Sequence, residues 1–306
     1  MSGFHSLQPD PSMIGRMLKP PFAVMPDPVA LFRQRAERFS VLARGSHLAP
    51  YLDFLAGLSR LQAELAAELP PAEVIPTEQV QRARENRMPP LDRASLAGDA
   101  GLRALARRFL EDVAALSMPA PAAAALAELR QAEPEVLDRM IGDVLADSIP
   151  ADALPQHLFL SAAVQVHGAR LASLLDPKQL VPVETGLCPC CGGPPFSSMV
   201  VGHQGAEGAR YAACAFCGTQ WNEVRIKCLA CGSTKGIGYM APESGEEATV
   251  KAETCDSCRS WVKILYQNRN PVLEPVADDV ASLGLDLLMR DTEYRRAGFD
   301  PFLLGY

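Results

Sequence analysis

The first 187 residues of this 306-residue chain contain no cysteine, and the whole chain has few aromatic residues. Phenylalanine, tryptophan and tyrosine together make up 6% of the sequence, so we expect a core composed mainly of alanine, leucine and valine. The hydrophobic share of 48% and the charged share of 21% are those of an ordinary globular protein. This length is sufficient for one large domain or for two to three smaller ones.

Long apolar runs and targeting segments are missing as well. No stretch approaches the roughly 20 apolar residues that span a bilayer, so we expect no membrane insertion. The N-terminal residues show no basic region followed by an apolar run and a small-residue cleavage site. The sequence therefore predicts a soluble, cytoplasmic protein. Its net charge of −7 argues against bulk attraction to nucleic acid or to an anionic membrane surface.

The motifs of common active sites are also absent. The chain has no G-x-S-x-G, no phosphate-binding glycine loop and no H-E-x-x-H. Its five histidines are scattered, and we expect helix-surface or core roles for them: His5, His47, His157, His167 and His203. The sequence therefore indicates a binding protein rather than an enzyme.

All nine cysteines lie between Cys188 and Cys258, and eight of them form four C-x-x-C pairs. The pairs, here called the first to fourth knuckles, are Cys188/Cys191, Cys214/Cys217, Cys228/Cys231 and Cys255/Cys258. Thiols in a chain without an export signal stay reduced, so metal ligation is favoured over disulfides. Two intervening residues let a tight turn present both thiolates to one ion. A glycine after the second cysteine eases the left-handed turn, and only the fourth knuckle, followed by Arg259, lacks it.

The cysteines and tryptophans repeat along the chain. The shift from the first knuckle to the third is 40 residues, from the second to the fourth 41, and from Trp221 to Trp261 again 40. Two tandem copies of one unit explain this spacing. They favour two metal ions with four ligands each: Cys188, Cys191, Cys214 and Cys217 for one, and Cys228, Cys231, Cys255 and Cys258 for the other. An interleaved pairing, in which the first and third knuckles share a metal, is the alternative.

The donor type limits the metals and the chemistry. Tetrahedral sulfur suits zinc, or iron as in rubredoxin. A closed four-thiolate site leaves no position for water or substrate, so it serves structure or electron transfer rather than hydrolysis. Cys190 is expected to be a small turn residue that points away from the metal.

The periodicity before residue 180 predicts helices, and the composition after it predicts short strands. The expected helices are Val29–Ala43, Tyr51–Leu69, Leu102–Leu116 with Asp99 as N-cap, Pro121–Gln131, Pro134–Ala146 and Gln156–Leu175. The expected strands are Phe196–Gly202, Tyr211–Ala213, Glu223–Ile226, Gly238–Met240, Thr249–Ala252 and Trp261–Tyr266. A last helix, about Ala277–Arg296, and an apolar tail are expected to return to the body. Residues 1–28 and the segment around Pro70–Leu96 are expected to be irregular.

These patterns predict an α+β multidomain protein. An N-terminal all-α bundle (residues 1–182) precedes two tandem zinc-ribbon-like four-cysteine modules (183–226 and 227–272), and a C-terminal helix with its tail (273–306) follows.

The cysteine-rich half resembles the FdhE family of formate dehydrogenase accessory proteins. The matching stretches are CPCCGGPPFSSMV (Cys188–Val200), GARYAACAFCGTQWNEVRIKCLAC (Gly208–Cys231), KAETCDSCRSWVKILYQNRNP (Lys251–Pro271), VADDVASLGLDLLM and DPFLLG. Four knuckles combined with these runs are far more specific than C-x-x-C alone. In the helical half, only short pieces such as PPLD (Pro89–Asp92) match the family.

The resemblance implies a function and a fold for the cysteine region. Family members are cytoplasmic assembly factors that act on the catalytic subunit of respiratory formate dehydrogenase, and their four-cysteine modules are rubredoxin-like. It thus implies the catalytic subunit as partner and two metal ions as cofactors, with iron favoured over zinc, bound by the two cysteine sets named above. A homodimer stays open.

Two other functions remain as alternatives. The modules could be working rubredoxins that transfer electrons. They could instead be zinc ribbons that bind nucleic acid, although Gly186–Asn270 carries eight Lys/Arg against seven Asp/Glu, and each loaded site adds about two negative charges.

Overall fold

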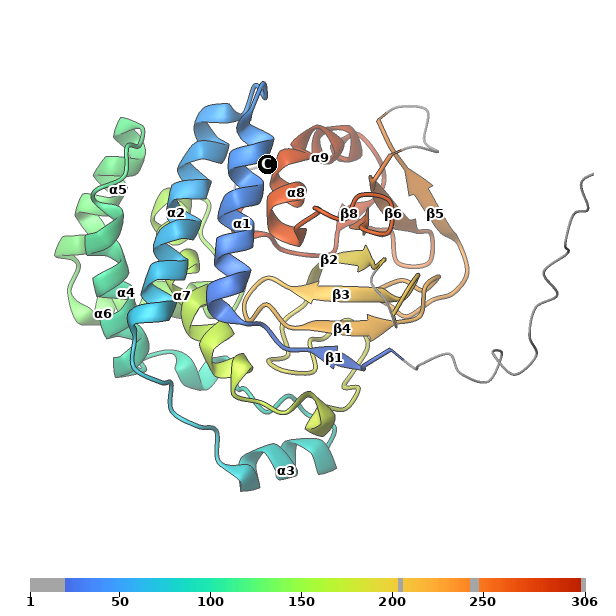
Figure 1. The fold of residues 1–306 in the computed structure, drawn as a ribbon, viewed down its shortest axis with the longest axis horizontal. Coiled ribbons are helices and arrows are strands. Elements are labelled where there is room, and N and C mark those ends of the chain that lie inside the picture. The colour runs from blue at the N-terminus through green and yellow to red at the C-terminus, as the bar shows by residue number, and fades with distance from the viewer. Residues whose placement is uncertain (1–19, 203–205, 243–247, 304–306) are drawn as a thin grey trace, which may run out of the picture.

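The computed structural model describes residues 20–202, 206–242 and 248–303 of the chain. Helices form one side of the molecule, and a twisted sheet lies against them (Figure 1). The helices of this side, called the helical part below, are α1 Pro28–Ala43, α2 Ala49–Glu68, α3 Thr77–Glu85, α4 Ala100–Val113, α5 Ala120–Gln131, α6 Pro134–Leu145 and α7 Leu154–Ser173. Within the described ranges, short 3-10 helices occur at Ala94–Leu96, Pro177–Gln179 and Pro301–Leu303.

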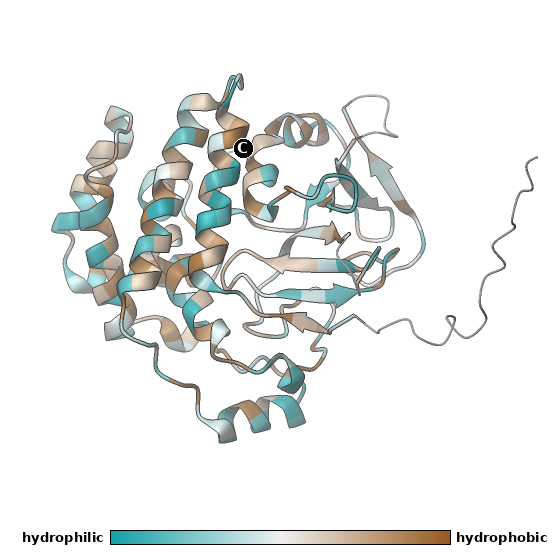
Figure 2. Cartoon of the chain, in the orientation of Figure 1, coloured by the Kyte–Doolittle hydropathy of each residue, from teal (hydrophilic) through white to brown (hydrophobic). Residues whose placement is uncertain are grey.

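The helices begin where local chemistry satisfies their first N–H groups. The side chain of Asp99 accepts a hydrogen bond from Leu102 N at 2.6 Å, which confirms the predicted N-cap of α4. Asp27 caps α1 in the same way through Ala30 N, and Pro28 occupies the first helical position. Brown and teal faces alternate along α1 and α2 (Figure 2), as expected for helices with one side against a core. No helix in the described ranges is long and apolar enough to cross a membrane.

The helix α3 is a difference from the expectation. The segment around Pro70–Leu96 was expected to be irregular, yet Thr77–Glu85 is helical. Only Val80 of this helix is buried, so the sequence offers almost no apolar periodicity there. Residues 70–76 and 86–93 on either side of the helix are irregular, as expected.

The strands form one sheet that runs through both cysteine repeats. They are β1 Ala23–Val24, β2 Pro195–Val200, β3 Arg210–Cys214, β4 Gln220–Glu223, β5 Ile237–Met240, β6 Val250–Cys255, β7 Ser260–Tyr266 and β8 Arg295–Arg296. The order is β1-β4-β3-β2-β7-β6-β5, with β8 beside β7. Within each repeat the strands are antiparallel, whereas β2 and β7 join the repeats as a parallel pair, from Ser197↔Lys263 to Val200↔Tyr266. The backbone hydrogen bonds between β2 and β7 therefore join the two repeats into one continuous sheet.

Two segments outside the repeats extend this sheet. Ala23 of β1 pairs with Trp221 of β4, so part of the N-terminal region expected to be irregular is a strand; residues 1–19 lie outside the described ranges. Arg296 of β8 pairs with Trp261 of β7. Each tryptophan strand is thus flanked by a two-residue strand from another part of the chain.

The strand expected at Glu223–Ile226 is wrong in position, because the strand lies at Gln220–Glu223 instead. The strand β4 ends at Glu223, and the side chains of Val224 and Ile226 are exposed. The buried guanidinium of Arg210 explains the change of direction, because its Nη1 donates to the carbonyl oxygens of Arg225 and Lys227 at 3.2 and 3.0 Å. These bonds hold the chain in a turn toward the second repeat.

The C-terminal helix is also different from the prediction. It is divided into α8 Pro275–Ala281 and α9 Leu283–Arg290, and it does not reach residue 296. Lys263 Nζ of β7 donates to the carbonyl oxygens of Asp279 and Ser282, at 2.6 and 3.3 Å. A carbonyl captured by a lysine is a poorer acceptor for the next helical turn, so the helix breaks at Ser282. The described part of the apolar tail docks onto the body: Phe302 and Leu303 are buried, and Tyr51 Oη donates to Phe302 O. Residues 304–306 lie outside the described ranges.

Candidate metal centres

The four knuckles come together in two groups of four sulfur atoms. The first group is Cys188, Cys191, Cys214 and Cys217, and the second group is Cys228, Cys231, Cys255 and Cys258. Within each group all sulfur atoms lie within 4.8 Å of one another. The structure therefore brings sequential knuckles together, and the interleaved alternative is wrong.

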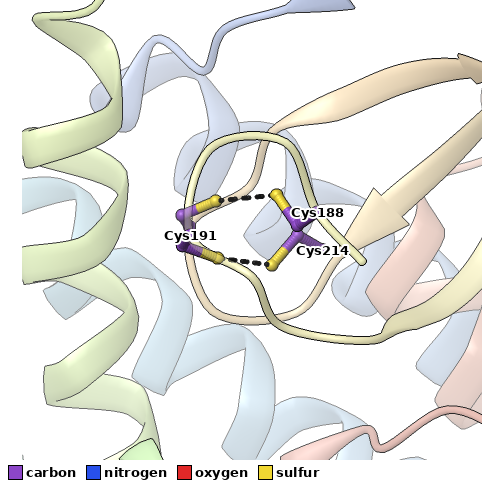
Figure 3. A group of neighbouring side chains, drawn as sticks. Cys188, Cys191 and Cys214 are labelled. Carbon is purple, nitrogen blue, oxygen red and sulfur yellow. Dashed lines mark hydrogen bonds between the residues drawn. The ribbon is translucent and has the colours of Figure 1, made fainter. Parts of the chain in front are cut away.

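The distances between sulfur atoms fit a shared metal ion. In the first group Cys188 and Cys217 are 3.7 Å apart, and Cys191 and Cys214 are 3.5 Å apart (Figure 3). The corresponding pairs of the second group, Cys228–Cys258 and Cys231–Cys255, are 3.7 and 3.8 Å apart. A tetrahedron with zinc–sulfur bonds of about 2.3 Å has edges of about 3.8 Å, whereas a disulfide needs about 2.05 Å. All eight cysteines are free thiols with the spacing of tetrahedral ligands.

All four knuckles have the same backbone geometry. The N–H of the residue after the second cysteine donates to the carbonyl oxygen of the first, in Gly192→Cys188, Gly218→Cys214, Gly232→Cys228 and Arg259→Cys255, at 2.9 to 3.2 Å. This residue is left-handed in every case, with φ of 75°, 69°, 78° and, for Arg259, 55°. The arginine that departs from the glycine pattern thus adopts the conformation that glycine adopts elsewhere. Its guanidinium pairs with Glu293 at 2.6 Å and lies over the Tyr294 ring.

A hydroxyl group beside each site was missed by the sequence reasoning. The sulfur of Cys217 lies 3.2 Å from Thr219 Oγ1, and that of Cys258 lies 2.9 Å from Ser260 Oγ. Hydrogen bonds from hydroxyls to a thiolate orient the ligand and tune the metal. The repeat shift of 41 relates Thr219 to Ser260, so the signal was present in the spacing.

The surroundings of the first group come from the helical part. From α7, Gln165 Nε2 donates to Ala215 O at 3.0 Å, and Gly168 leaves room for the Phe216 ring, which would lie 2.7 Å from an added Cβ. From α1, Leu31 lies against Gly218, because an added Cβ on Gly218 would be 2.7 Å from its side chain. Leu91 N donates to Cys190 O at 3.0 Å, which ties the first knuckle to the loop before α4. All four cysteines of this group are buried.

The second group is more open. Cys228 and Cys255 are buried, but Cys231 and Cys258 are exposed. Its third knuckle contacts the segment just before the first knuckle. An added Cβ on Gly232 would be 3.2 Å from Thr185, and one on Gly186 would be 3.1 Å from the carbonyl oxygens of Leu229 and Ala230.

The thiols of the first group affect one another. Burial raises the pKa of Cys188 and of Cys191 well above the ordinary value. Burial acts in the same direction on Cys217, but hydrogen bonds from the other thiols outweigh it and hold the pKa of Cys217 well below the ordinary value.

Cys190 does not point away from this group. It is fully buried, and a hydrogen bond with Cys217, followed by burial, raises the pKa of its thiol well above the ordinary value. Cys190 is not one of the four grouped cysteines, as expected, but its side chain is buried beside Cys217 rather than directed away from the group.

None of the histidines that the structure describes, His47, His157 and His167, belongs to either group. His157 is buried in α7, where its Nδ1 lies 2.7 Å from Ala153 O. Burial lowers the pKa of His167 in the same helix. His5 and His203 lie outside the described residues.

A mixed helical and sheet fold with two closed four-cysteine groups defines a class of two-site, cysteine-rich proteins. Models of three FdhE domains match the chain: "FdhE, N-terminal" at residues 20–185, "FdhE, central domain" at 187–225 and "FdhE, C-terminal domain" at 226–303. The chain therefore belongs to the FdhE family, which is a family of formate dehydrogenase accessory proteins.

Individual relatives support this assignment along nearly the whole chain. "Protein FdhE homolog" of Rhizobium meliloti is 61% identical over 301 residues and covers 98% of both chains. "Protein FdhE homolog" of Cronobacter sakazakii is 36% identical over 276 residues, which are 89% of this chain and 88% of the relative. The crystal structure of the FdhE protein from Pseudomonas aeruginosa superimposes with a TM-score of 0.83 at 32% identity, over 94% of this chain and 99% of that one.

Proposed function

We propose that this chain is an accessory protein for the maturation of respiratory formate dehydrogenase. It binds the enzyme's catalytic subunit in the cytoplasm, before export, and has no turnover of its own. Family membership supports formate dehydrogenase as the protein that this chain assists, here called the client. The single structural observation that supports binding rather than catalysis is the pair of closed four-sulfur groups. Such groups leave no open coordination position for a substrate.

We also infer that the eight knuckle cysteines hold two metal ions, with iron favoured and zinc accepted. Two sulfur-only groups at tetrahedral spacing fit either metal. A bound ion would cross-link the ends of each hairpin, and iron would add a reversible one-electron change. The proposed division is a helical domain to residue 182, rubredoxin-like modules at 183–226 and 227–272, and a C-terminal helical segment to 306.

The test of the proposed function is capture of the client from the native host. The tagged protein is purified from cells grown without oxygen that express formate dehydrogenase, beside a Cys188→Ala/Cys191→Ala variant. We expect the catalytic subunit to be recovered with the wild type and lost with the variant, and metal analysis to show two ions per chain. Size-exclusion chromatography of the client-free protein then tests for a homodimer. Recovery of nucleic acid instead of the catalytic subunit would overturn the proposal.

Electron transfer is the second candidate, because one observation favours it. The two exposed sulfur ligands of the second group would bring an iron centre within reach of a redox partner. Zinc substitution separates the two functions. Electron transfer requires iron, whereas client binding through a metal scaffold is expected to persist with zinc.

A further inference from the structure

A positive charge from the helical part lies beside the first four-cysteine group. Arg93 follows the PPLD segment that ties the first knuckle to the helices, and its side chain is 12% exposed. Its guanidinium lies over the ring of Phe216, a residue inside the second knuckle, with 5.3 Å to the ring centroid. Arg93 thus comes from the helical part of the chain, but its side chain lies at the first four-cysteine group.

Gly193, just after the first knuckle, lies beside both this arginine and a cysteine of the first group. A Cβ placed on Gly193 would lie 2.6 Å from Arg93 Nη1 and 3.6 Å from Cys214 Sγ. Both atoms therefore border the same small space, and no larger residue could occupy position 193 without displacing one of them. Burial alone would lower the pKa of Arg93. The hydrogen bonds and charge of Asp147, with smaller contributions from Cys191 and Cys214, raise it instead, so the side chain stays cationic.

Asp147 orients the arginine. Arg93 Nη1 and Nη2 donate to its two carboxylate oxygens at 2.9 and 2.8 Å, and Nη2 also donates to Val144 O at 3.3 Å. The planar two-bond geometry fixes the guanidinium against the Phe216 ring. The bend after α6 that carries Asp147 is itself left-handed at this residue, with φ of 52°.

The cations beside the second group are more exposed than Arg93 and pair with other residues. Arg259 is about half exposed and pairs with Glu293. Lys227 has its Cε 3.7 Å from the place of an added Cβ on Gly232, but its side chain is 21% exposed and its Nζ pairs with Glu223. Exposed sulfur ligands are stabilised by water, whereas a buried four-thiolate site with a formal charge of about −2 needs a counter-charge within the protein. The first group is the buried one and has the arginine.

We infer that Arg93 is the electrostatic counter-charge and positioning residue of the first metal site, and that Asp147 sets how strongly its charge acts there. This inference rests on the proposed metal occupancy but not on the identity of the client. A cation stabilises the −2 form of an iron–thiolate site more than the −1 form, so it favours metal retention and raises the reduction potential.

The test uses the full-length chain loaded with zinc and, separately, with iron. We expect Arg93→Met to release one of its two zinc ions to a chelator about tenfold faster than the wild type, and the other at an unchanged rate. With iron, the potential of one centre should fall in Arg93→Met and rise in Asp147→Asn, where the cation loses its neutralising partner. Arg93→Lys should retain most of the wild-type values. Arg103→Met is the matched control, because Arg103 is a partly buried arginine that pairs with Asp138 within the helical part, and this variant should change neither the release rates nor the potentials.

Opposite signs in Arg93→Met and Asp147→Asn distinguish electrostatics from disruption. A merely structural role predicts that both variants loosen the site in the same direction, which would overturn the inference. Unchanged release and potential in both variants would also overturn it. If the wild type itself retains no metal at this group, the proposed function fails, a result distinct from two bound ions that ignore Arg93. Circular dichroism and thermal melting exclude variants that do not fold.

Discussion

The two four-cysteine groups share a sequence pattern and a backbone geometry but occupy different surroundings. The first is enclosed by α1, α7 and the loop that carries Arg93, and all its ligands are buried. The second contacts the segment around Thr185 and Gly186, and two of its four cysteines are exposed. A repeat therefore specifies a local site, and its place in the fold then decides whether that site belongs to the core or to the surface.

The third strands of the repeats show the same difference. The shift of 40 relates Glu223 of β4 to Lys263 of β7. Glu223 lies near the sheet edge and pairs with Lys227 at 3.0 Å. Lys263 lies in the middle of the sheet, is fully buried, and pairs with Asp279 and Asp286 at 2.9 and 2.5 Å. One repeat position is a partly exposed pair in the first copy and a buried charge cluster in the second.

The largest expected effect comes from removing one group at a time. We expect Cys188→Ala/Cys191→Ala to lose one metal and to loosen the helical part as well, because its knuckles pack against α1 and α7. A structural four-cysteine metal contributes about 10 kcal/mol in small modules, comparable to the whole stability of a typical domain. Cys228→Ala/Cys231→Ala should lose one metal and leave the helices folded. Hydrogen exchange of the helical amides measures both; equal exchange in the two variants would contradict the comparison.

The second prediction concerns the related strand positions. Lys263→Met leaves two buried carboxylates with only Arg296 as a charged partner, so we expect a loss of about 3–5 kcal/mol in the free energy of unfolding. Glu223→Gln is the matched control and should change stability by less than about 1 kcal/mol. Urea denaturation followed by circular dichroism provides the comparison. Similar losses in both variants would show that the place in the sheet does not matter.

The third prediction concerns metal release. A chelator reaches exposed Cys231 and Cys258 directly, so the second group should release its ion roughly tenfold faster than the first. Lower pH should accelerate release, because protons compete with the metal for thiolates. The absorbance of the chelator complex follows both phases, and the fast phase should be missing from Cys228→Ala/Cys231→Ala. A fast phase that persists in that variant would assign the labile ion to the buried group.

The smallest effect is expected at the left-handed residues that end the knuckles. Arg259→Gly relieves a left-handed side chain but adds chain entropy, so stability should change by less than about 1 kcal/mol. Gly218→Ala introduces that strain at φ of 69° and a Cβ 2.7 Å from Leu31, and about 2 kcal/mol of destabilisation is expected. Thermal melting of the metal-loaded proteins compares them. A larger loss in Arg259→Gly would mean that the Glu293 contact, rather than the backbone, dominates the fourth knuckle.

Local rules predicted much of this molecule correctly. The six helices expected before residue 180 exist with ends within a few residues, Asp99 caps α4, and sequential knuckles form the two groups. These features depend on neighbours in sequence: helical period, capping side chains and turns of four residues. The missed features depend on distant residues. The helix α3 has almost no buried face, and the expected last helix breaks because Lys263, in strand β7, binds its carbonyl oxygens.

The sequence by itself determined which cysteines form the four knuckles and, through the repeat, favoured the sequential grouping that the structure has, because C-x-x-C turns are local structures with their own geometry. Only the tertiary structure decided that β2 and β7 join the repeats into one sheet, that the first group is buried and the second exposed, and that Arg93 and Cys190 lie at the first site. The reason is physical: burial and electrostatic environment are set by which surfaces pack together, and two copies of one motif cannot both occupy the same place in a fold.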